Sequence, residues 1–240
     1  MEDKQCKIHV TNLKKNFGKL EVLKDISVDV QEGEVVVLLG PSGSGKSTLA
    51  KLIVGIIKPT SGKIIYNGTD ITDMSISDRA KLGISFAFQQ PVRFKGIKVI
   101  DLLRMASGKQ LSISEACEYL SEVGLCARDY INREVDASLS GGELKRIEIA
   151  TIIARGTELS VFDEPEAGID LWSFAKLVET FQHLQAQSKQ SIILISHQER
   201  IMQLADEIII IENGRMKTRG TREAILPSLM NEFEPCGLKK

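Results

Sequence analysis

Residues 40–48 read GPSGSGKST and fit the pattern G-x-x-x-x-G-K-[ST] of a phosphate-binding loop, the P-loop. The apolar run VVVLL at 35–39 precedes the loop and predicts a buried parallel strand. After the loop, apolar residues recur at helical spacing, at Leu49, Leu52, Ile53 and Ile56. The loop therefore joins the end of a strand to the start of a helix, where unpaired N–H groups point toward an anion.

Each residue type in the loop suits a triphosphate and its metal ion. Glycines let the backbone wrap a phosphate without a Cβ in the way, and successive N–H groups form an anion-binding concavity. We expect Lys46 to reach the β- and γ-phosphates, Ser47 to coordinate Mg²⁺, and Thr48 to lie at the α-phosphate. The alternative is a glycine-rich loop that binds nothing. The expected nucleotide contacts are Gly40, Pro41, Ser42, Gly43, Ser44, Gly45, Lys46, Ser47 and Thr48.

Composition indicates an ordinary globular protein. The 240 residues are 42% hydrophobic and 26% charged, with a net charge of -1 from 31 basic and 32 acidic residues. This balance lacks the basic excess of a nucleic-acid-binding protein. No apolar run approaches the ~18 residues of a membrane-spanning helix, and the start MEDKQCKIHV lacks a signal-peptide core. We therefore expect a cytoplasmic protein that does not insert into a membrane.

Four cysteines lie far apart without a C-x-x-C pair: Cys6, Cys117, Cys126 and Cys236. This spacing argues against a zinc site and against a disulfide framework. Cys117 shares a helical face with Ile113 and Leu120 and is expected to be a small buried hydrophobe. Cys236, in a polar tail, is the candidate for exposed thiol chemistry.

The N-terminal region has a β pattern. Polar and apolar residues alternate between positions 7 and 30, which predicts antiparallel strands, and residues 62–66 continue the region up to a turn at Asn67-Gly68. Phe17 lies within this region, in KKNFGKLEVL. It is either a half-buried hairpin aromatic or, given the P-loop, a ring that stacks on adenine.

The rest of the chain alternates strands with helices. Short apolar strands are expected at 84–88, 159–162, 192–195 and 208–211. This order predicts an α/β fold with a mostly parallel core sheet, helices on both faces and a ligand at the carboxyl ends of the strands. Residues 91–157 have mainly helical spacing and predict an inserted helical subdomain, with Ser112 and Glu115 as a capping box. Residues 1–240 then form one domain with a tail at 228–240.

Polar residues follow two of these strands. Asp163 comes at the end of an apolar strand, where a carboxylate can hold Mg²⁺ directly or through water, and Glu164 beside it is a candidate general base. The alternative is an ordinary acidic turn. His197 follows the next strand and could bind a γ-phosphate oxygen or a water, although a single histidine there is usually only a satisfied polar residue.

The segment LSGGE at 139–143 is a second phosphate-binding candidate. Ser140, Gly141 and Gly142 open a helix, so a hydroxyl, backbone amides and the helix dipole can all point at a phosphate. Because the P-loop already serves one nucleotide, this helix start could serve the nucleotide of another molecule.

These motifs together resemble the ATP-binding cassette (ABC) ATPase family. The resemblance is carried by GPSGSGKS, Gln89, LSGGE, SVFDEP, the segment 167–170 and His197, in this order and spacing. It implies a P-loop NTPase fold of ABC type in which two copies sandwich two ATP molecules. Lys46, Ser47, Asp163, Glu164 and His197 of one copy would then act with Ser140, Gly141, Gly142 and Glu143 of the other. It also implies that Gln89 senses Mg²⁺, that Phe17 stacks on adenine and that Asp170 lies in a loop crossing between the copies.

Within that family, LSGGELKRIEIA and EPEAGID resemble the ATPase subunit of Suf-type iron–sulfur cluster assembly, as does FAFQQPVRFKGIKV. This resemblance implies a soluble Suf-type scaffold protein as the partner. The alternative is the ATP-binding subunit of a membrane transporter, with the helical segment docked on a permease. Trp172 is a candidate partner contact, with partial burial against its own domain or the second copy as the alternative.

Overall fold

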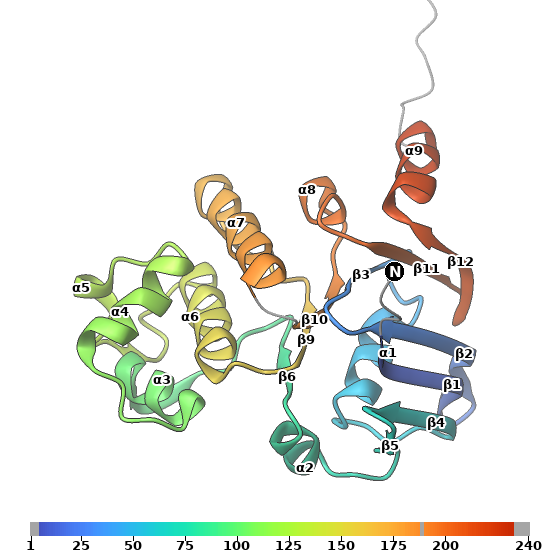
Figure 1. Cartoon of the computed structure of the whole chain (residues 1–240), viewed down its shortest axis with the longest axis horizontal. Helices are drawn as coiled ribbons and strands as arrows, with labels where there is room; N and C mark the ends of the chain where they lie inside the picture. The colour runs from blue at the N-terminus through green and yellow to red at the C-terminus, as the bar shows by residue number, and fades with distance from the viewer. Residues whose placement is uncertain (1–4, 188–189, 233–240) are drawn as a thin grey trace, which may run out of the picture.

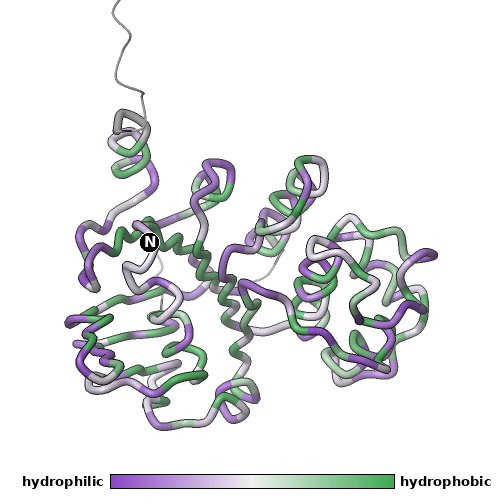
Figure 2. The backbone as a smooth tube through the Cα atoms, turned by 180° about the vertical axis from the view of Figure 1, so that it is seen from behind, coloured by the Kyte–Doolittle hydropathy of each residue, from purple (hydrophilic) through white to green (hydrophobic). Residues whose placement is uncertain are grey.

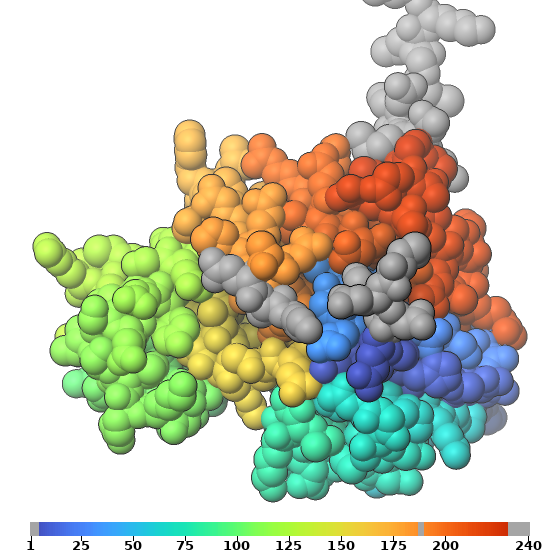
Figure 3. Space-filling model, viewed as in Figure 1, coloured from blue at the N-terminus to red at the C-terminus, as the bar shows by residue number. Residues whose placement is uncertain are grey.

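The structure, a computed structural model, describes residues 5–187 and 190–232. Its described strands form sheets of six, four and two strands. In Figure 1 the antiparallel strands β1, β2 and β4 lie at one end of the molecule, and helices α3, α4 and α5 gather at the other. The space-filling view shows the green helical segment projecting from the rest of the molecule (Figure 3). None of the described helices has both the length and the apolar character needed to span a bilayer.

The six-stranded sheet is the predicted parallel core. Its order is β12-β11-β3-β10-β9-β6, and all neighbouring strands except the edge pair β11–β12 are parallel. The strands are β3 (Val35–Leu39), β6 (Ile84–Ala87), β9 (Leu159–Asp163), β10 (Ser191–Ile195), β11 (Glu207–Glu212) and β12 (Arg215–Thr221). Every residue of β3, β9 and β10 is buried, as expected for apolar parallel strands covered on both faces.

The two faces of this sheet pack into separate cores. Val35, Val37 and Leu39 of β3 join a cluster with α6 and α7, whereas Val36 and Leu38 join a cluster with α1 and the antiparallel sheet. The flanking helices are α1 (Lys46–Ile53), α2 (Ile76–Lys81), α6 (Gly141–Arg155), α7 (Leu171–Gln187), α8 (Glu199–Met202) and α9 (Arg222–Glu232). Figure 2 shows hydrophobic positions concentrated along the central strands between these layers. The predicted layered α/β fold is confirmed.

The N-terminal β region is also as predicted. Its four-stranded sheet has the order β2-β1-β4-β5, with β1 (Cys6–Phe17), β2 (Leu20–Gln31), β4 (Ser61–Tyr66) and β5 (Thr69–Asp70). Asn67 and Gly68 both have positive φ, which is the requirement for a tight two-residue hairpin turn.

Residues 91–157 contain α3 (Val99–Ser107), α4 (Ile113–Glu122), α5 (Ala127–Tyr130) and α6. The capping box of Ser112 and Glu115 begins α4 as predicted. The segment also contains a small antiparallel sheet of β7 (Phe94–Lys98) and β8 (Glu134–Val135), which the sequence pattern does not reveal because β7 has no buried residue.

Two apolar residues are exposed at helix starts. Helical spacing predicts that Ile113 packs with Cys117 and Leu120, and that Leu171 packs with Phe174, Val178 and Phe181. Ile113 is 65% exposed and Leu171 is 71% exposed, so both of these packing predictions were wrong. Each is the first residue of its helix, where the chain enters from a loop. Residues 228–232 of the predicted tail belong to α9, and Cys236 lies outside the described residues.

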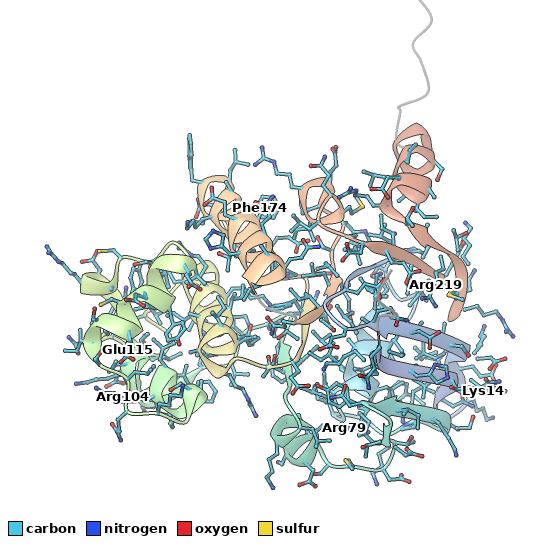
Figure 4. All side chains as sticks on the ribbon, viewed as in Figure 1. Lys14, Arg79, Arg104, Glu115, Phe174 and Arg219 are labelled. Carbon is cyan, nitrogen blue, oxygen red and sulfur yellow. The ribbon has the colours of Figure 1, made fainter. Side chains whose placement is uncertain are left out.

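Arg79 fixes the far end of the helix that follows the P-loop. It is 1% exposed and donates hydrogen bonds to the carbonyls of Leu52 (2.7 Å) and Ile53 (2.8 Å), at the end of α1, and to that of Thr72 (2.9 Å). Figure 4 labels Arg79 between α2 and the sheet region. The guanidinium satisfies carbonyls that a helix end leaves without intrahelical partners.

We predict that Arg79→Met lowers the free energy of unfolding by about 2–3 kcal/mol, because charge-assisted hydrogen bonds are lost and buried carbonyls lose their donor. Urea unfolding measures the change. Lys81→Met, on the exposed side of the same helix, is the control, with an expected change within about 0.5 kcal/mol. Similar losses in both variants would contradict this role.

Candidate nucleotide-binding site

At two positions of the P-loop, Gly40 and Gly45, there is no space for a side chain. A Cβ on Gly40 would lie 1.9 Å from the Ile211 carbonyl oxygen, and a Cβ on Gly45 would lie 2.4 Å from Leu23 Cδ2. Gly40, Gly43 and Gly45 also have φ values of 138°, 75° and 109°, which favour glycine. Gly45 caps α1 without a side-chain hydrogen bond, so the first N–H groups of the helix are left for another acceptor. This cradle fits a phosphate.

Lys46 supplies the positive charge of the cradle. Its Nζ donates to the carbonyl oxygens of Gly40 at 2.6 Å and Pro41 at 2.9 Å, which holds the ammonium over its own loop. Burial lowers the pKa of Lys46, while Glu164 and Asp163 nearby act in the opposite direction. The other partner of Lys46 Nζ is the Ser44 hydroxyl at 3.5 Å, so the partly desolvated ammonium has neutral partners here and is well suited to an incoming phosphate.

Ser47 and Asp163 come together as a metal site requires. The Ser47 hydroxyl donates to Asp163 Oδ1 at 3.1 Å, and Asp163 is 1% exposed at the end of β9. Burial raises the pKa of Asp163, and the Ser47 hydrogen bond partly opposes this effect. A hydroxyl and a carboxylate are the oxygen ligands that Mg²⁺ prefers, so the residues fit the predicted ion.

Gln89 and Glu164 are also direct neighbours. Gln89 Nε2 donates to Glu164 Oε2 at 2.7 Å across the ends of β6 and β9. Glu164 has φ 48°, uncommon for a residue other than glycine, and its N–H donates to the Ile195 carbonyl at 2.9 Å. Such backbone conformations persist where surrounding contacts fix them and are common at functional sites.

His197 follows β10 and is exposed. The pKa of His197 is lowered by partial desolvation of the ring and then by the Lys46 charge, while Glu164 raises it. Strand β10 lies between the parallel strands β3 and β9, so His197 follows β10 at the edge where the P-loop follows β3 and Asp163 ends β9. The structure therefore brings the predicted P-loop, metal and strand-end residues to one edge of the sheet.

Glu166 is a partly buried acid at this edge that the sequence reading did not single out. Ser196, next to His197, donates its hydroxyl to Glu166 Oε1 at 2.6 Å, and the buried Oε2 has no hydrogen-bond partner among the described residues. Burial raises the pKa of Glu166. The signal was available in the sequence EPE, where a second acid follows Glu164 two positions later.

The LSGGE segment begins α6 through a capping box. Ser140 Oγ accepts from the Glu143 N–H at 3.2 Å, and the Glu143 carboxylate accepts from the Ser140 N–H at 2.6 Å and from the Tyr130 hydroxyl. Gly142 is required because a Cβ there would lie 2.6 Å from the Gly168 carbonyl oxygen, whereas Gly141 has open space. The Glu143 carboxylate is thus engaged within its own chain, and its predicted nucleotide contact stays a prediction.

The sequence model of the family described as ABC transporter matches residues 23–167, more than half of the chain. The chain belongs to the ABC transporter family. It is 39% identical to the uncharacterized ABC transporter ATP-binding protein MJ0035 of Methanocaldococcus jannaschii, over 92% of this chain and 90% of that protein. It is 31% identical to the probable ATP-dependent transporter ycf16 of Cyanophora paradoxa, over 90% of this chain and 89% of that protein.

The fold of this cassette matches solved cassettes as well. The dimeric post-hydrolysis structure of the ATP-binding cassette MJ0796, bound to ADP and Pi, superposes with a TM-score of 0.81 at 24% identity. The match covers 90% of this chain and 98% of that one. This likeness confirms the predicted ABC-type fold.

Phe17 of the cassette lies at the end of β1 and is 50% exposed. Lys15 Nζ lies 4.9 Å from the centroid of its ring, at the distance of a cation–π contact. The ring is exposed enough to stack on a base, and adenine stacking stays a prediction.

Asp170 and Trp172 both lie at the start of α7, where Asp170 contacts the helix backbone and Trp172 is exposed to solvent. The Asp170 carboxylate accepts the N–H groups of Trp172 at 3.1 Å and Ser173 at 3.0 Å, so it caps the helix. Trp172 is 87% exposed, which rules out its burial against its own domain. Contact with another molecule is the remaining expectation for this side chain.

The sequence reading missed the ion pair in α6 between the buried Lys145 and the partly buried Glu148. Lys145 Nζ is 3.6 Å from Glu148 Oε2 and donates to the carbonyl of Phe88 and to that of Asp163, at 3.4 Å. Glu148 Oε1 accepts the Phe88 N–H at 3.0 Å. One helix turn therefore holds both polar backbone groups of Phe88, the residue before Gln89. The sequence signal was the pair of charges inside an otherwise apolar helix face.

We predict that Glu148→Ala lowers the free energy of unfolding by about 3 kcal/mol, because it leaves the fully buried Lys145 charge without its partner. Urea unfolding provides the measurement. The exposed pair of Lys176 and Glu179 has the same i,i+3 spacing and supplies the control Glu179→Ala, with an expected loss below about 0.5 kcal/mol. Equal losses in the two variants would contradict the burial argument.

Proposed function

We propose that this cassette binds and hydrolyses ATP between two copies of itself and transmits the closing motion to a partner. The observation that carries this proposal is the convergence of Lys46, Ser47, Asp163, Gln89 and Glu164 at one sheet edge. The supporting likeness is to a cassette solved as a dimer with ADP and Pi.

The residues divide the work by their chemistry. Lys46 and the first N–H groups of α1 hold the phosphates, and Ser47 with Asp163 holds Mg²⁺, which would supply charge neutralisation of the phosphate oxygens. Glu164 accepts the proton of the attacking water, and Gln89 orients the Glu164 carboxylate through their hydrogen bond. His197 donates to the terminal phosphate from the neighbouring strand end.

Ser140 of the second copy completes the site. In the capping box its hydroxyl oxygen accepts a hydrogen bond, so its proton remains available for donation to a phosphate. The N–H groups of Gly141 and Gly142 lie in the first turn of α6, where helix N–H groups have no intrahelical acceptor. The helix start therefore offers donors to an anion that approaches from outside the chain.

We predict that Glu164→Gln lowers kcat by about 10²-fold or more, as expected for loss of a general base, while ATP still binds and the dimer accumulates. Lys46→Ala should lose both binding and turnover, because it removes the phosphate-facing charge. Phosphate release and size-exclusion chromatography with ATP are the measurements, and Glu179→Gln is the exposed control. Wild-type turnover in Glu164→Gln would refute the assigned role.

An apolar groove beside the site is the docking surface that we assign to the partner. It has a volume of about 330 Å³ and is lined by residues of β6, β7, α3 and α6. Val92, Phe94 and Met105 in this groove are 44%, 38% and 58% exposed, and Phe88 connects it to Gln89. A partner seated there contacts the chain directly next to the hydrogen bond of Gln89 with Glu164.

A membrane permease is the first candidate for this partner. Two relatives that align with most of this chain are named as an ABC transporter ATP-binding protein and a probable ATP-dependent transporter. A cassette of such a system needs no membrane-spanning helix of its own, and an amphipathic permease helix would fit an apolar groove.

A Suf-type scaffold protein is the second candidate. The residues that favour it are Lys145 and Glu148, which belong to the stretch LSGGELKRIEIA that resembles Suf-type ATPases. Lys145 is buried, Glu148 is partly buried, and both contact Phe88 beneath the groove, so they are structural features of the docking region. On this hypothesis the closing of two copies around ATP acts on a soluble scaffold for iron–sulfur cluster assembly.

We predict that a photo-crosslinker at Phe94 captures the partner and that Val92→Asp prevents capture, because a charge would have to be buried in the apolar groove. Ile113→Asp, at an exposed apolar site on α4, is the matched control. Mass spectrometry of the product distinguishes the candidates: a chain with several apolar spans supports the permease, and a soluble β-rich chain supports the scaffold. Equal capture in both variants would exclude this groove.

A further inference from the structure

Cys6, His9 and Asp29 form a cluster of three different metal-ligating side chains on the antiparallel sheet. The Cys6 Sγ, a His9 ring nitrogen and an Asp29 carboxylate oxygen all lie within 4.8 Å of one another. His9 Nδ1 contacts Asp29 Oδ1 directly. Thiolate, imidazole and carboxylate are the ligand types that proteins use for zinc.

A β-bulge creates this arrangement. His9 pairs with Asp29 across the strands, Ile8 pairs with Val30, and Cys6 pairs with Gln31, so β1 has one extra residue between Cys6 and Ile8. Strict alternation would place residues three positions apart on opposite faces. The extra residue reverses this parity, so Cys6 and His9 share the outer face while Lys7 and Ile8 are both buried. Bulges commonly redirect a side chain in this way.

Arg219 supports the cluster from the neighbouring strand β12. Its Nη1 lies 3.6 Å from Asp29 Oδ2, and its Nη2 donates to the Asp29 carbonyl at 3.3 Å. The guanidinium is fixed in turn by Glu207, through a 2.6 Å bond from Nε. Arg219 is labelled in Figure 4 beside the antiparallel strands. Arg219 therefore holds Asp29 through Oδ2, and Oδ1 faces His9. Contacts of this kind, from residues that do not bind the metal themselves, orient carboxylate ligands in metal sites.

We propose that Cys6, His9 and Asp29 bind a divalent cation of the zinc class, with the fourth coordination position open to water. The cysteine spacing had argued against a zinc site, but the fold supplies the other ligands from a neighbouring residue and the paired strand. The site would connect β1 and β2 near the N-terminus.

This site is separate from the expected Mg²⁺ site in place and in chemistry. The P-loop contacts the same sheet at Val22 and Leu23, toward the opposite end of the β1–β2 hairpin. Leu23 and Asp29 are six positions apart, which corresponds to roughly 20 Å along a strand. Mg²⁺ prefers oxygen ligands alone, whereas a thiolate and an imidazole select zinc-class metals.

The experiment uses Co²⁺ as a spectroscopic probe with the full chain, freed of metal and reduced, without nucleotide or Mg²⁺. The expected result is a thiolate-to-cobalt charge-transfer band that saturates at one ion per chain and is displaced by Zn²⁺. Cys6→Ser should abolish the band, and His9→Gln should weaken Co²⁺ binding at least tenfold. Cys126→Ser, at an exposed cysteine, is the matched control and should bind like wild type.

Absence of the band in the wild-type chain, or an equal band in Cys6→Ser, would overturn the proposal and leave His9 and Asp29 as an ordinary cross-strand pair. ATP hydrolysis by Cys6→Ser shows that the variant is folded. A wild-type chain that hydrolyses ATP normally but shows no cobalt band would refute the metal site alone, so failure here is distinguishable from failure of the proposed function.

Discussion

The hydrogen bond from Ser47 to Asp163 connects two parts of the chain that are 116 positions apart, and the site depends on it. It can form because β3 and β9 are parallel strands on either side of β10, so their carboxyl ends meet at one edge. The P-loop follows β3 and the acidic pair follows β9. If either β3 or β9 ran in the opposite direction, Ser47 and Asp163 would lie at opposite edges of the sheet.

Close backbone packing fixes the rest of that edge. Gly40 packs against the carbonyl of Ile211 in the six-stranded sheet, and Gly45 packs against Leu23 in the antiparallel sheet. The P-loop therefore lies between the two sheets. Gly142 lies in the same way against Gly168, which fixes the LSGGE segment relative to the loop that follows β9. These glycines are needed for space as much as for their backbone freedom. The shape of the site is therefore determined by contacts between layers, with few side-chain adjustments possible.

Much of the fold and of the site could be predicted because local patterns were strong. Strands β3, β9 and β10 are short apolar runs, and Ser47, Asp163 and Glu164 follow from their positions at strand ends. Features that depend on long-range pairing were not predictable. The β7–β8 pair has no apolar alternation, and the Lys145–Glu148 contacts to Phe88 require knowing that α6 packs on β6. The Cys6 cluster depends on a bulge that leaves no residue pattern.

Helix α6 has two roles: its start offers hydrogen-bond donors to the outside, and its second turn contacts the backbone of Phe88. Its first residues offer donors outward from Ser140, while Lys145 and Glu148, one turn later, hold the backbone of Phe88 within the same chain. Removing Lys145 and Glu148 from those contacts would leave charges buried without partners, which is costly. These contacts hold the Phe88 backbone against α6. Because Gln89 follows Phe88 and donates to Glu164, the helix that begins after Ser140 is connected to the candidate base through two adjacent residues.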